Sequence, residues 1–195
     1  HPRVRRQRQM CIRDRKYILR QEPMKNHTTF RIGGPADIFV APENMEEIKA
    51  VSRFAKEEGI PLFVLGNGSN LLVADDGMDG IVLQIYKNYS GIEVRGNELI
   101  VKAGTLLSST SRAALNEELT GFEFAGGIPG TFGGAVVMNA GAYGGEMVQV
   151  LKEVTVLTKE GEIKTLKAEE LELGYRTSNV LKLSLIHISE PTRRS

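Results

Sequence analysis

Residues 121–145 read GFEFAGGIPGTFGGAVVMNAGAYGG, and this stretch decides the fold. It holds nine of the 21 glycines of the 195-residue chain, interleaved with seven Phe, Ile, Val and Met side chains. Flexible linkers lack such apolar residues, so the stretch is expected to be packed. Glycine lacks the Cβ that keeps a ligand away from the backbone, and it reaches positive φ at little cost. The stretch therefore predicts a packed site where backbone N–H groups approach a flat or anionic ligand.

A turn followed by a helix is expected inside this stretch. Pro129, Gly130 and Thr131 are typical turn residues, and a helix is predicted to start near Gly133. The N-terminus of a helix carries unpaired N–H groups and a partial positive charge, which suit a phosphate. We therefore expect this helix to point its N-terminus at a phosphate.

A second glycine-rich element, GNGSN, occupies residues 66–70 between two short apolar runs. A tight Gly/Asn/Ser loop can form a nest of N–H groups that suits a pyrophosphate. It matches neither G-x-x-x-x-G-K-[ST], because no lysine follows, nor G-x-G-x-x-G, because the third glycine is absent. Taken alone the loop is also consistent with an ordinary turn. Its occurrence together with residues 121–145 favours one nucleotide ligand shared by both elements.

The segment before residue 86 is predicted to form a βαβ-like unit. Asn44 and Glu47 have the spacing of a helix N-cap and a reach-back acid, and Gly59 is placed as the C-terminal cap. The expected elements are a strand at 37–41, a helix at 45–58, a buried strand at 61–65, a return to the sheet at 71–73 and a strand at 81–85.

The second predicted unit begins near Ser90. Thr105 is expected to cap its first helix. The expected elements are a hairpin of 92–94 with 99–101, a helix at 106–119, a hairpin of 148–157 with 162–166, and a short helix at 168–173.

Composition narrows the class of protein. Apolar residues make up 41% of the chain and charged residues 25%, as in ordinary globular proteins. Cys11 is the single cysteine and the three histidines are scattered, so an internal disulfide and a metal centre are not expected. The sequence has no apolar run of 18 residues and no secretory pattern, which predicts a cytoplasmic protein without a membrane partner.

Charge is distributed unevenly along the chain. Residues 1–16 carry seven Lys or Arg and one Asp, whereas residues 17–183 are acidic, with 22 Asp or Glu against 16 Lys or Arg. Residues 1–16 and 184–195 have no packing pattern, and both are predicted to be non-native or disordered tails outside the fold. The remaining chain is divided into subdomain 1, residues 17–86, and subdomain 2, residues 87–183.

Four stretches of the chain carry a family resemblance. They are NHTTFRIGGPAD at 26–37, LGNGSNLL at 65–72, GGIPG through NAGAYG at 126–144, and GYRTS at 174–178. In this order and spacing they resemble the UDP-N-acetylenolpyruvoylglucosamine reductases, which lie within the vanillyl-alcohol-oxidase-like flavoproteins. The resemblance runs through residues 17–182.

The resemblance implies an α/β (α+β) fold in which two small α/β subdomains of the PCMH type hold FAD between them. It also implies that the C-terminal substrate domain of the family is truncated here. The residues implied to bind the cofactor are Gly66, Asn67, Gly68, Ser69, Asn70, Leu71, Ile128, Pro129, Gly130, Thr131, Gly133, Gly134, Asn139, Gly141, Ala142 and Tyr143.

The activity implied by the resemblance is the NADPH-linked reduction of UDP-N-acetylglucosamine enolpyruvate to UDP-N-acetylmuramate, in peptidoglycan precursor synthesis. Arg176 is implied to be catalytic, because a fixed guanidinium stabilises the enolate charge that hydride addition builds beside a carboxylate. Tyr175 is implied to lie beside the substrate. The family's proton-donating serine and its glutamate have no counterpart here, so the chain alone is expected not to turn over.

Two alternatives remain open. One is another flavin oxidoreductase of the same FAD-binding fold with a different substrate. The other is a non-enzymatic module whose basic arm, residues 1–16, binds nucleic acid, which the acidic body disfavours. The main interpretation predicts a monomer whose partner is a UDP-sugar when the C-terminal domain is supplied, and no nucleic-acid partner.

Overall fold

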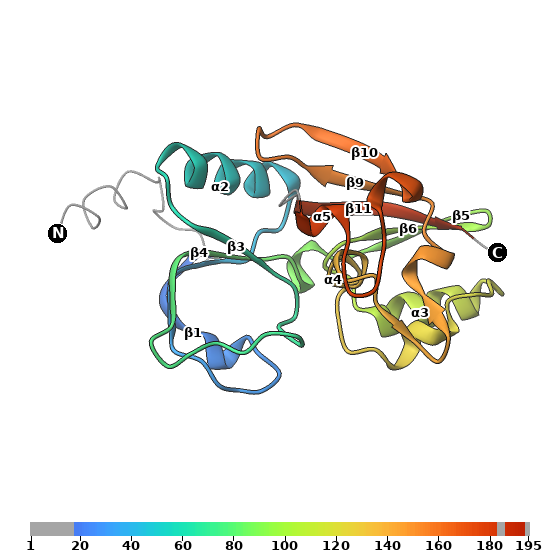
Figure 1. Cartoon of the computed structure of the whole chain (residues 1–195), viewed down its shortest axis with the longest axis horizontal. Coiled ribbons are helices and arrows are strands. Elements are labelled where there is room, and N and C mark those ends of the chain that lie inside the picture. The colour runs from blue at the N-terminus through green and yellow to red at the C-terminus, as the bar shows by residue number, and fades with distance from the viewer. Residues whose placement is uncertain (1–17, 183–185, 194–195) are drawn as a thin grey trace.

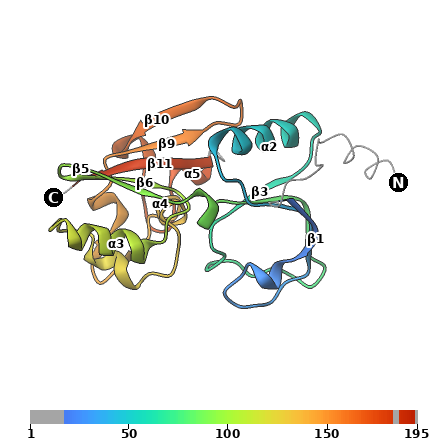
Figure 2. The same cartoon turned by 180° about the vertical axis from the view of Figure 1, so that it is seen from behind.

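The computed structural model describes residues 18–182 and 186–193. The predicted basic tail, residues 1–16, lies outside the described residues. Two sheets lie side by side, with strands β1 to β4 at one end of the molecule and strands β5, β6, β9, β10 and β11 at the other (Figures 1 and 2). The mixed α/β class expected from the sequence is confirmed. The subdomain boundary at 86 and 87 remains a prediction.

The first sheet has the strand order β1-β2-β4-β3. Its strands are β1 (Ile18–Pro23), β2 (Pro35–Val40), β3 (Leu62–Leu65) and β4 (Met78–Gln84). Strand β1 is antiparallel to β2, while β4 runs parallel to both β2 and β3. Parallel strands of one sheet need a long crossover, and α2 (Met45–Glu57) supplies it between β2 and β3, which lie on either side of β4.

Helix α2 begins and ends where its capping residues predict. The Asn44 side chain accepts a hydrogen bond from the Glu47 N–H at 3.0 Å, and Gly59 follows the helix with φ of +61°. Ile48, Val51 and Ala55 are buried, so the helix packs its apolar face inward. The Glu47 carboxylate reaches back to the Glu43 N–H at 2.9 Å.

Two expectations for this unit were wrong. The run at 61–65 was expected to be buried, yet β3 is an edge strand whose Phe63 and Val64 are 40% and 41% exposed. An apolar run does not distinguish an edge strand from a central one, because its pairing is settled elsewhere in the chain. Residues 71–73 were expected to return to the sheet, but they form no strand.

The second sheet is antiparallel throughout, with the order β10-β9-β11-β6-β5. Its strands are β5 (Ile92–Arg95), β6 (Glu98–Lys102), β9 (Glu153–Leu157), β10 (Ile163–Lys167) and β11 (Ile186–Arg193). Both predicted hairpins form. The expectation that residues 184–195 stay outside the fold was wrong for 186–193, because β11 supplies backbone pairing between β9 and β6.

Helices and short turns complete the second unit. The helices are α3 (Leu107–Asn116), α4 (Phe132–Val137) and α5 (Asn179–Lys182), and strands β7 (Gly141–Ala142) and β8 (Gly145–Glu146) form a small hairpin. The single-turn helices are η1 (Met24–Asn26), η2 (Lys87–Tyr89), η3 (Glu123–Gly127), η4 (Met147–Gln149) and η5 (Ala168–Leu171). The helix predicted at 168–173 is thus one 3-10 turn.

The predicted cap at Thr105 was also wrong. The N-cap of α3 is Leu106, which has no side-chain oxygen to offer. The Thr105 hydroxyl instead bonds the backbone of Gly91 at 3.0 Å. Thr105 therefore ties the start of α3 to the entrance of strand β5.

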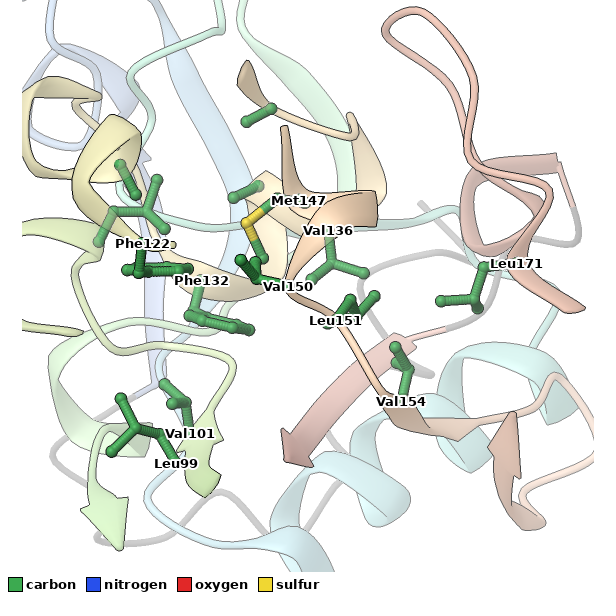
Figure 3. Close-up of a cluster of buried hydrophobic side chains, with 14 of the residues drawn as sticks. Leu99, Val101, Phe122, Phe132, Val136, Met147, Val150, Leu151, Val154 and Leu171 are labelled. Carbon is green, nitrogen blue, oxygen red and sulfur yellow. The ribbon is translucent and has the colours of Figure 1, made fainter. Parts of the chain in front are cut away.

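The main core lies under α4 and the second sheet. Phe132 and Val136 of α4 meet Met147, Val150 and Leu151 in a cluster of buried side chains (Figure 3). A second cluster joins residues of the first sheet to Leu157 and Ile186 of the second, so the two sheets share buried apolar surface. Within the described ranges, no helix is long and apolar enough to cross a membrane.

Candidate nucleotide-binding site

The two glycine-rich elements, 60 residues apart in sequence, lie against each other. The Ser69 hydroxyl and the Pro129 carbonyl oxygen are 2.6 Å apart, a hydrogen bond that links the two loops. A Cβ placed on Gly66 would lie 2.5 Å from the Thr131 Oγ1. This contact is closer than any side chain larger than hydrogen allows, so Gly66 sets the spacing between the loops.

The loop at 66–70 is held from its carbonyl side. The Gly66 carbonyl accepts from Gln84 Nε2 at 3.1 Å, and the Gly68 carbonyl accepts from the Thr29 N–H at 3.1 Å. Gly68 has φ of +70°, and a Cβ there would lie 1.9 Å from the carbonyl oxygen of His27. The loop is therefore locked in a conformation that requires glycine at position 68.

The backbone N–H groups of this loop have no protein acceptors among the described residues. They are the N–H groups of Asn67, Gly68, Ser69 and Asn70. Successive N–H groups pointing to one side form an anion-binding nest. A phosphate would satisfy donors that the protein itself leaves unpaired.

The first N–H groups of α4 donate to protein acceptors. The Phe132 N–H donates to the Thr105 carbonyl at 2.7 Å, and the Gly133 N–H donates to the Ala103 carbonyl at 2.9 Å. The Gly134 N–H lies 3.3 Å from the Thr131 hydroxyl, which caps the helix. The first three N–H groups of α4 therefore already have protein acceptors, and the expectation that this helix N-terminus holds a phosphate stays a prediction. The contacts of Gly133 and Gly134 with the cofactor also remain predictions.

A hollow of about 330 Å³ adjoins this junction. Leu106, which forms part of its wall, pairs with Thr131 in an antiparallel bridge, so the hollow and the second loop share a boundary. The hollow is lined by Tyr86, Lys87, Ser90, Gly91, Ile92, Gly104, Thr105, Leu106 and Ser109. Its walls are mostly apolar, and its lining residues with polar groups are Lys87, Ser90, Ser109, Thr105 and Tyr86.

The remaining predicted residues lie at the other end of α4. Gly141 and Ala142 form strand β7, and Tyr143 follows them at the tip of the small hairpin, 98% exposed and with φ of +53°. Asn139 is buried at the end of α4. Helix α4 has six residues, so its two ends are about 9 Å apart.

Tyr175 and Arg176 occupy the tip of a tight turn. Gly174 and Thr177 exchange backbone hydrogen bonds of 3.1 and 3.3 Å across the turn. Arg176 has φ of +56°, and its guanidinium carbon lies 5.8 Å from the centre of the Tyr175 ring. Tyr175 is 87% exposed, so both side chains face outward from the turn.

The structure thus separates the predicted site residues into two groups. It brings residues 66–71 together with residues 128–134, and it places residues 139–143 with the 174–177 turn at the far end of α4. Two of the predicted side chains face the core instead of the solvent: Leu71 packs in the cluster with Met24, and Ile128 packs against the main core.

Sequence reasoning missed the residues that hold these loops. Gln84, at the end of β4, holds the Gly66 carbonyl, and the Ser178 hydroxyl donates to the Val137 carbonyl at 2.8 Å while fully buried. At Gln84, the sequence signal that could have indicated this role is a polar residue at the end of an apolar run. No local pattern identifies the partner of Ser178, which lies 41 positions away.

A search against protein families identifies the class. The model for the FAD binding domain matches residues 36–167, which include both glycine-rich loops. The chain therefore belongs to this family of FAD binding domains.

Two curated relatives show which group of enzymes the chain resembles. The UDP-N-acetylenolpyruvoylglucosamine reductase of Geobacillus kaustophilus is 54% identical over 172 residues, covering 88% of this chain and 56% of the relative. The reductase of the same name from Alkaliphilus oremlandii is 53% identical over 169 residues, covering 87% and 56%. The predicted resemblance to this group of reductases is confirmed. The chain spans about half the length of the curated relatives it matches.

Solved structures agree with the sequence relatives. The crystal structure of UDP-N-acetylenolpyruvylglucosamine reductase from Thermus caldophilus aligns with a TM-score of 0.76 at 35% identity, covering 91% of this chain and 60% of that chain. A BBE-like protein of Physcomitrella patens aligns with a TM-score of 0.63 at 16% identity, covering 87% and 38%. The second likeness, at its low identity, supports the fold alone.

Proposed function

We propose that the chain is the FAD-binding portion of an enzyme that reduces UDP-N-acetylglucosamine enolpyruvate to UDP-N-acetylmuramate with NADPH. The observation that carries the proposal is the row of unpaired N–H groups at residues 67–70. They are held against the second glycine-rich loop in a chain that belongs to the FAD binding domain family.

The residues present fit the diphosphate of FAD. Asn67, Gly68, Ser69 and Asn70 would hold it through backbone N–H groups, while the bonds to the Gly66 and Gly68 carbonyls fix the conformation of the loop. The hollow beside Leu106 offers apolar walls that suit a purine. The hairpin that carries Gly141, Ala142 and Tyr143 lies at the other end of α4, where we place the flavin side of the cofactor.

Substrate chemistry is assigned to the Tyr175–Arg176 turn. When bound, FAD supplies the hydride acceptor and donor between NADPH and the enolpyruvyl double bond. Arg176 would hold the substrate carboxylate and stabilise the negative charge that grows beside it, because a guanidinium matches a carboxylate in two parallel hydrogen bonds. Tyr175 would lie against the substrate. Completion of the substrate site, and protonation of the enolate that hydride addition leaves, would fall to residues beyond the half of the relatives that this chain matches.

The biological setting follows from the same proposal. The product would enter peptidoglycan synthesis, and the expected location is the cytoplasm. We expect a monomer with no nucleic-acid or membrane partner. A flavin oxidoreductase of the same fold acting on another substrate is the alternative, and binding of the UDP-sugar by a full-length relative carrying this segment decides between them.

Reconstitution with FAD tests the cofactor assignment directly. The purified chain is titrated with FAD, and flavin fluorescence is followed together with the absorbance spectrum of the desalted protein. We expect a stoichiometric yellow complex whose absorbance near the flavin maximum falls on addition of NADPH. A chain that folds, as judged by circular dichroism, but takes up neither FAD nor FMN contradicts the proposal.

A further inference from the structure

The turn that carries Tyr175 and Arg176 is anchored by side chains that do not belong to it. We propose that Asn139 is a positioning residue: it holds this turn and the Tyr143 hairpin at one spacing through its side-chain amide. This inference rests on the proposed function, because it concerns the two elements assigned to the flavin side and to the substrate.

The contacts of the Asn139 side chain use all of its hydrogens. Its Nδ2 donates to the Gly174 carbonyl at 3.2 Å and to the Glu146 carboxylate at 3.0 Å, and its Oδ1 accepts from the Val148 N–H at 3.0 Å. The residue is only 4% exposed. Gly174 opens the Tyr175–Arg176 turn, and Glu146 ends the hairpin that carries Tyr143. One amide therefore bridges the two elements.

A second bond fixes the far side of the same turn. The buried Ser178 hydroxyl donates to the Val137 carbonyl at 2.8 Å. Val137 and Asn139 both lie at the C-terminal end of α4. The turn is thus attached to one helix end at Gly174 and again at Ser178, with Tyr175 and Arg176 left outward between the two attachments.

Left-handed backbone also occurs in both elements that Asn139 joins. Asn139, Tyr143 and Arg176 have φ of +41°, +53° and +56°, which are left-handed conformations that residues with a Cβ seldom adopt. Such conformations persist only where surrounding contacts hold them, and they gather at functional sites. The hydrogen bonds of the Asn139 side chain are contacts that hold both the Tyr143 hairpin and the Tyr175–Arg176 turn.

The end of α3 provides a matched comparison within the chain. Both helices end in a Schellman motif. At α4 the Asn139 N–H bonds the Val136 carbonyl and the Ala140 N–H bonds the Ala135 carbonyl, at 3.1 and 2.8 Å. At α3 the corresponding bonds run from Glu118 to Leu115 and from Leu119 to Ala114, also at 3.1 and 2.8 Å.

The two left-handed residues differ in their side chains. Glu118, with φ of +55°, is exposed, and no partner for its carboxylate exists within the described residues. Replacement by glycine keeps the left-handed cap in both motifs. Asn139→Gly therefore removes the bridging amide alone, and Glu118→Gly is its control.

The chain contains no tryptophan, so Tyr175→Trp places a single reporter on the turn. The measurements are the fluorescence anisotropy of this indole without FAD, the rate of trypsin cleavage after Arg176, and the dissociation constant of FAD. In the Tyr175→Trp background, we expect Asn139→Gly to lower the anisotropy and to speed cleavage by roughly tenfold, because all three hydrogen bonds of the buried side chain are lost. Glu118→Gly should change neither.

The FAD measurement separates this proposal from the previous one. Asn139 is itself among the residues implied to bind the cofactor, so Asn139→Gly is expected to weaken FAD binding as well, and the positioning role is judged only from the measurements made without FAD. Failure of every variant, the parent included, to bind FAD defeats the proposed function. The anisotropy measured without FAD still decides the role of Asn139. Anisotropy and cleavage unchanged by Asn139→Gly overturn the positioning role.

A second pair of variants covers the case in which Asn139→Gly does not fold. Asn139→Asp keeps the volume of the side chain but loses both donors and sets a carboxylate beside Glu146. Adding Glu146→Gln supplies an amide that donates in the reverse direction. We expect Asn139→Asp to mobilise the indole and the double substitution to restore part of its anisotropy. An Asn139→Asp protein with parental anisotropy overturns the inference.

Discussion

The loop at 66–70 and the segment at 128–134 are both rich in glycine, yet protein acceptors satisfy the donors at the start of α4 and leave those of 67–70, Gly130 and Thr131 without partners among the described residues. The first gives its Gly66 and Gly68 carbonyls to protein donors and leaves the N–H groups of 67–70 unpaired. In the second segment, the N–H groups of Phe132 and Gly133 donate to protein carbonyls. Glycine thus marks close approach of the backbone in both places, but only the pairing of each group decides whether a ligand or the chain itself approaches.

The largest effect is expected from Gly68→Ala. The new Cβ would lie 1.9 Å from the His27 carbonyl oxygen at φ of +70°, so the loop must move and its N–H groups lose their common direction. FAD should bind at least about 100-fold more weakly, since clash and strain together cost on the order of 3 kcal/mol. Titration of flavin fluorescence measures this loss.

Gly96→Ala is the matched control for that substitution. Gly96 has φ of +59°, but no atom lies within 4 Å of the position that a Cβ would take, so alanine meets strain without a clash. It should lower the unfolding free energy by about 1 kcal/mol and leave FAD affinity unchanged. Equal losses of affinity in the two variants would break the link between loop geometry and binding.

Gly66→Ala should have the next largest effect. Its Cβ would lie 2.5 Å from the Thr131 Oγ1, which forces the two loops apart and weakens FAD binding by roughly tenfold. Thr131→Ala removes the clashing oxygen, so the double substitution should recover part of the affinity. Strictly additive losses in this cycle would show that the loops do not constrain each other.

The single substitution Thr131→Ala is expected to lower the stability of α4 without a comparable loss of FAD affinity. Loss of the N-cap should cost about 1 kcal/mol of unfolding free energy, read from the urea midpoint. FAD affinity should change by less than about threefold, because the N–H groups of α4 are already paired within the protein. A fall in affinity comparable with that of Gly68→Ala would overturn the contrast between the two loops.

Ser69→Ala is expected to weaken FAD binding less than either glycine substitution in the loop. It removes the hydroxyl that reaches the Pro129 carbonyl, a bond of 2.6 Å, and should weaken FAD binding by roughly fivefold, consistent with about 1 kcal/mol for one hydrogen bond. Ser108→Ala, at an exposed position of helix α3, provides the comparison, with no change expected. An unchanged affinity in both variants would mean that this link does not order the loop.

Local patterns predicted the elements whose causes are local. Asn44 and Gly59 delimit α2, and the hairpin around Gly96 forms where its turn residues stand. Thr131 caps the helix expected near Gly133. Each of these depends on residues a few positions apart, whose chemistry acts within one turn of backbone.

Elements defined by distant partners were predicted less well. Strand β3 became an edge strand, and 186–193 joined the second sheet as β11. Pairing of strands depends on which backbone edge is available, and this is decided by segments far away in sequence. The assigned roles of Tyr175, Arg176 and the cofactor-binding residues remain predictions.

By itself, the sequence determined the family, the mixed α/β class and the two loops at which the backbone comes close to something, because glycine positions, capping residues and apolar spacing are local properties. Only the tertiary structure decided what each loop approaches. Thr105 and Ala103 satisfy the donors of α4, while nothing in the described chain satisfies those of residues 67–70. A backbone N–H group looks the same in every sequence, and its role depends on which acceptor the fold brings to it.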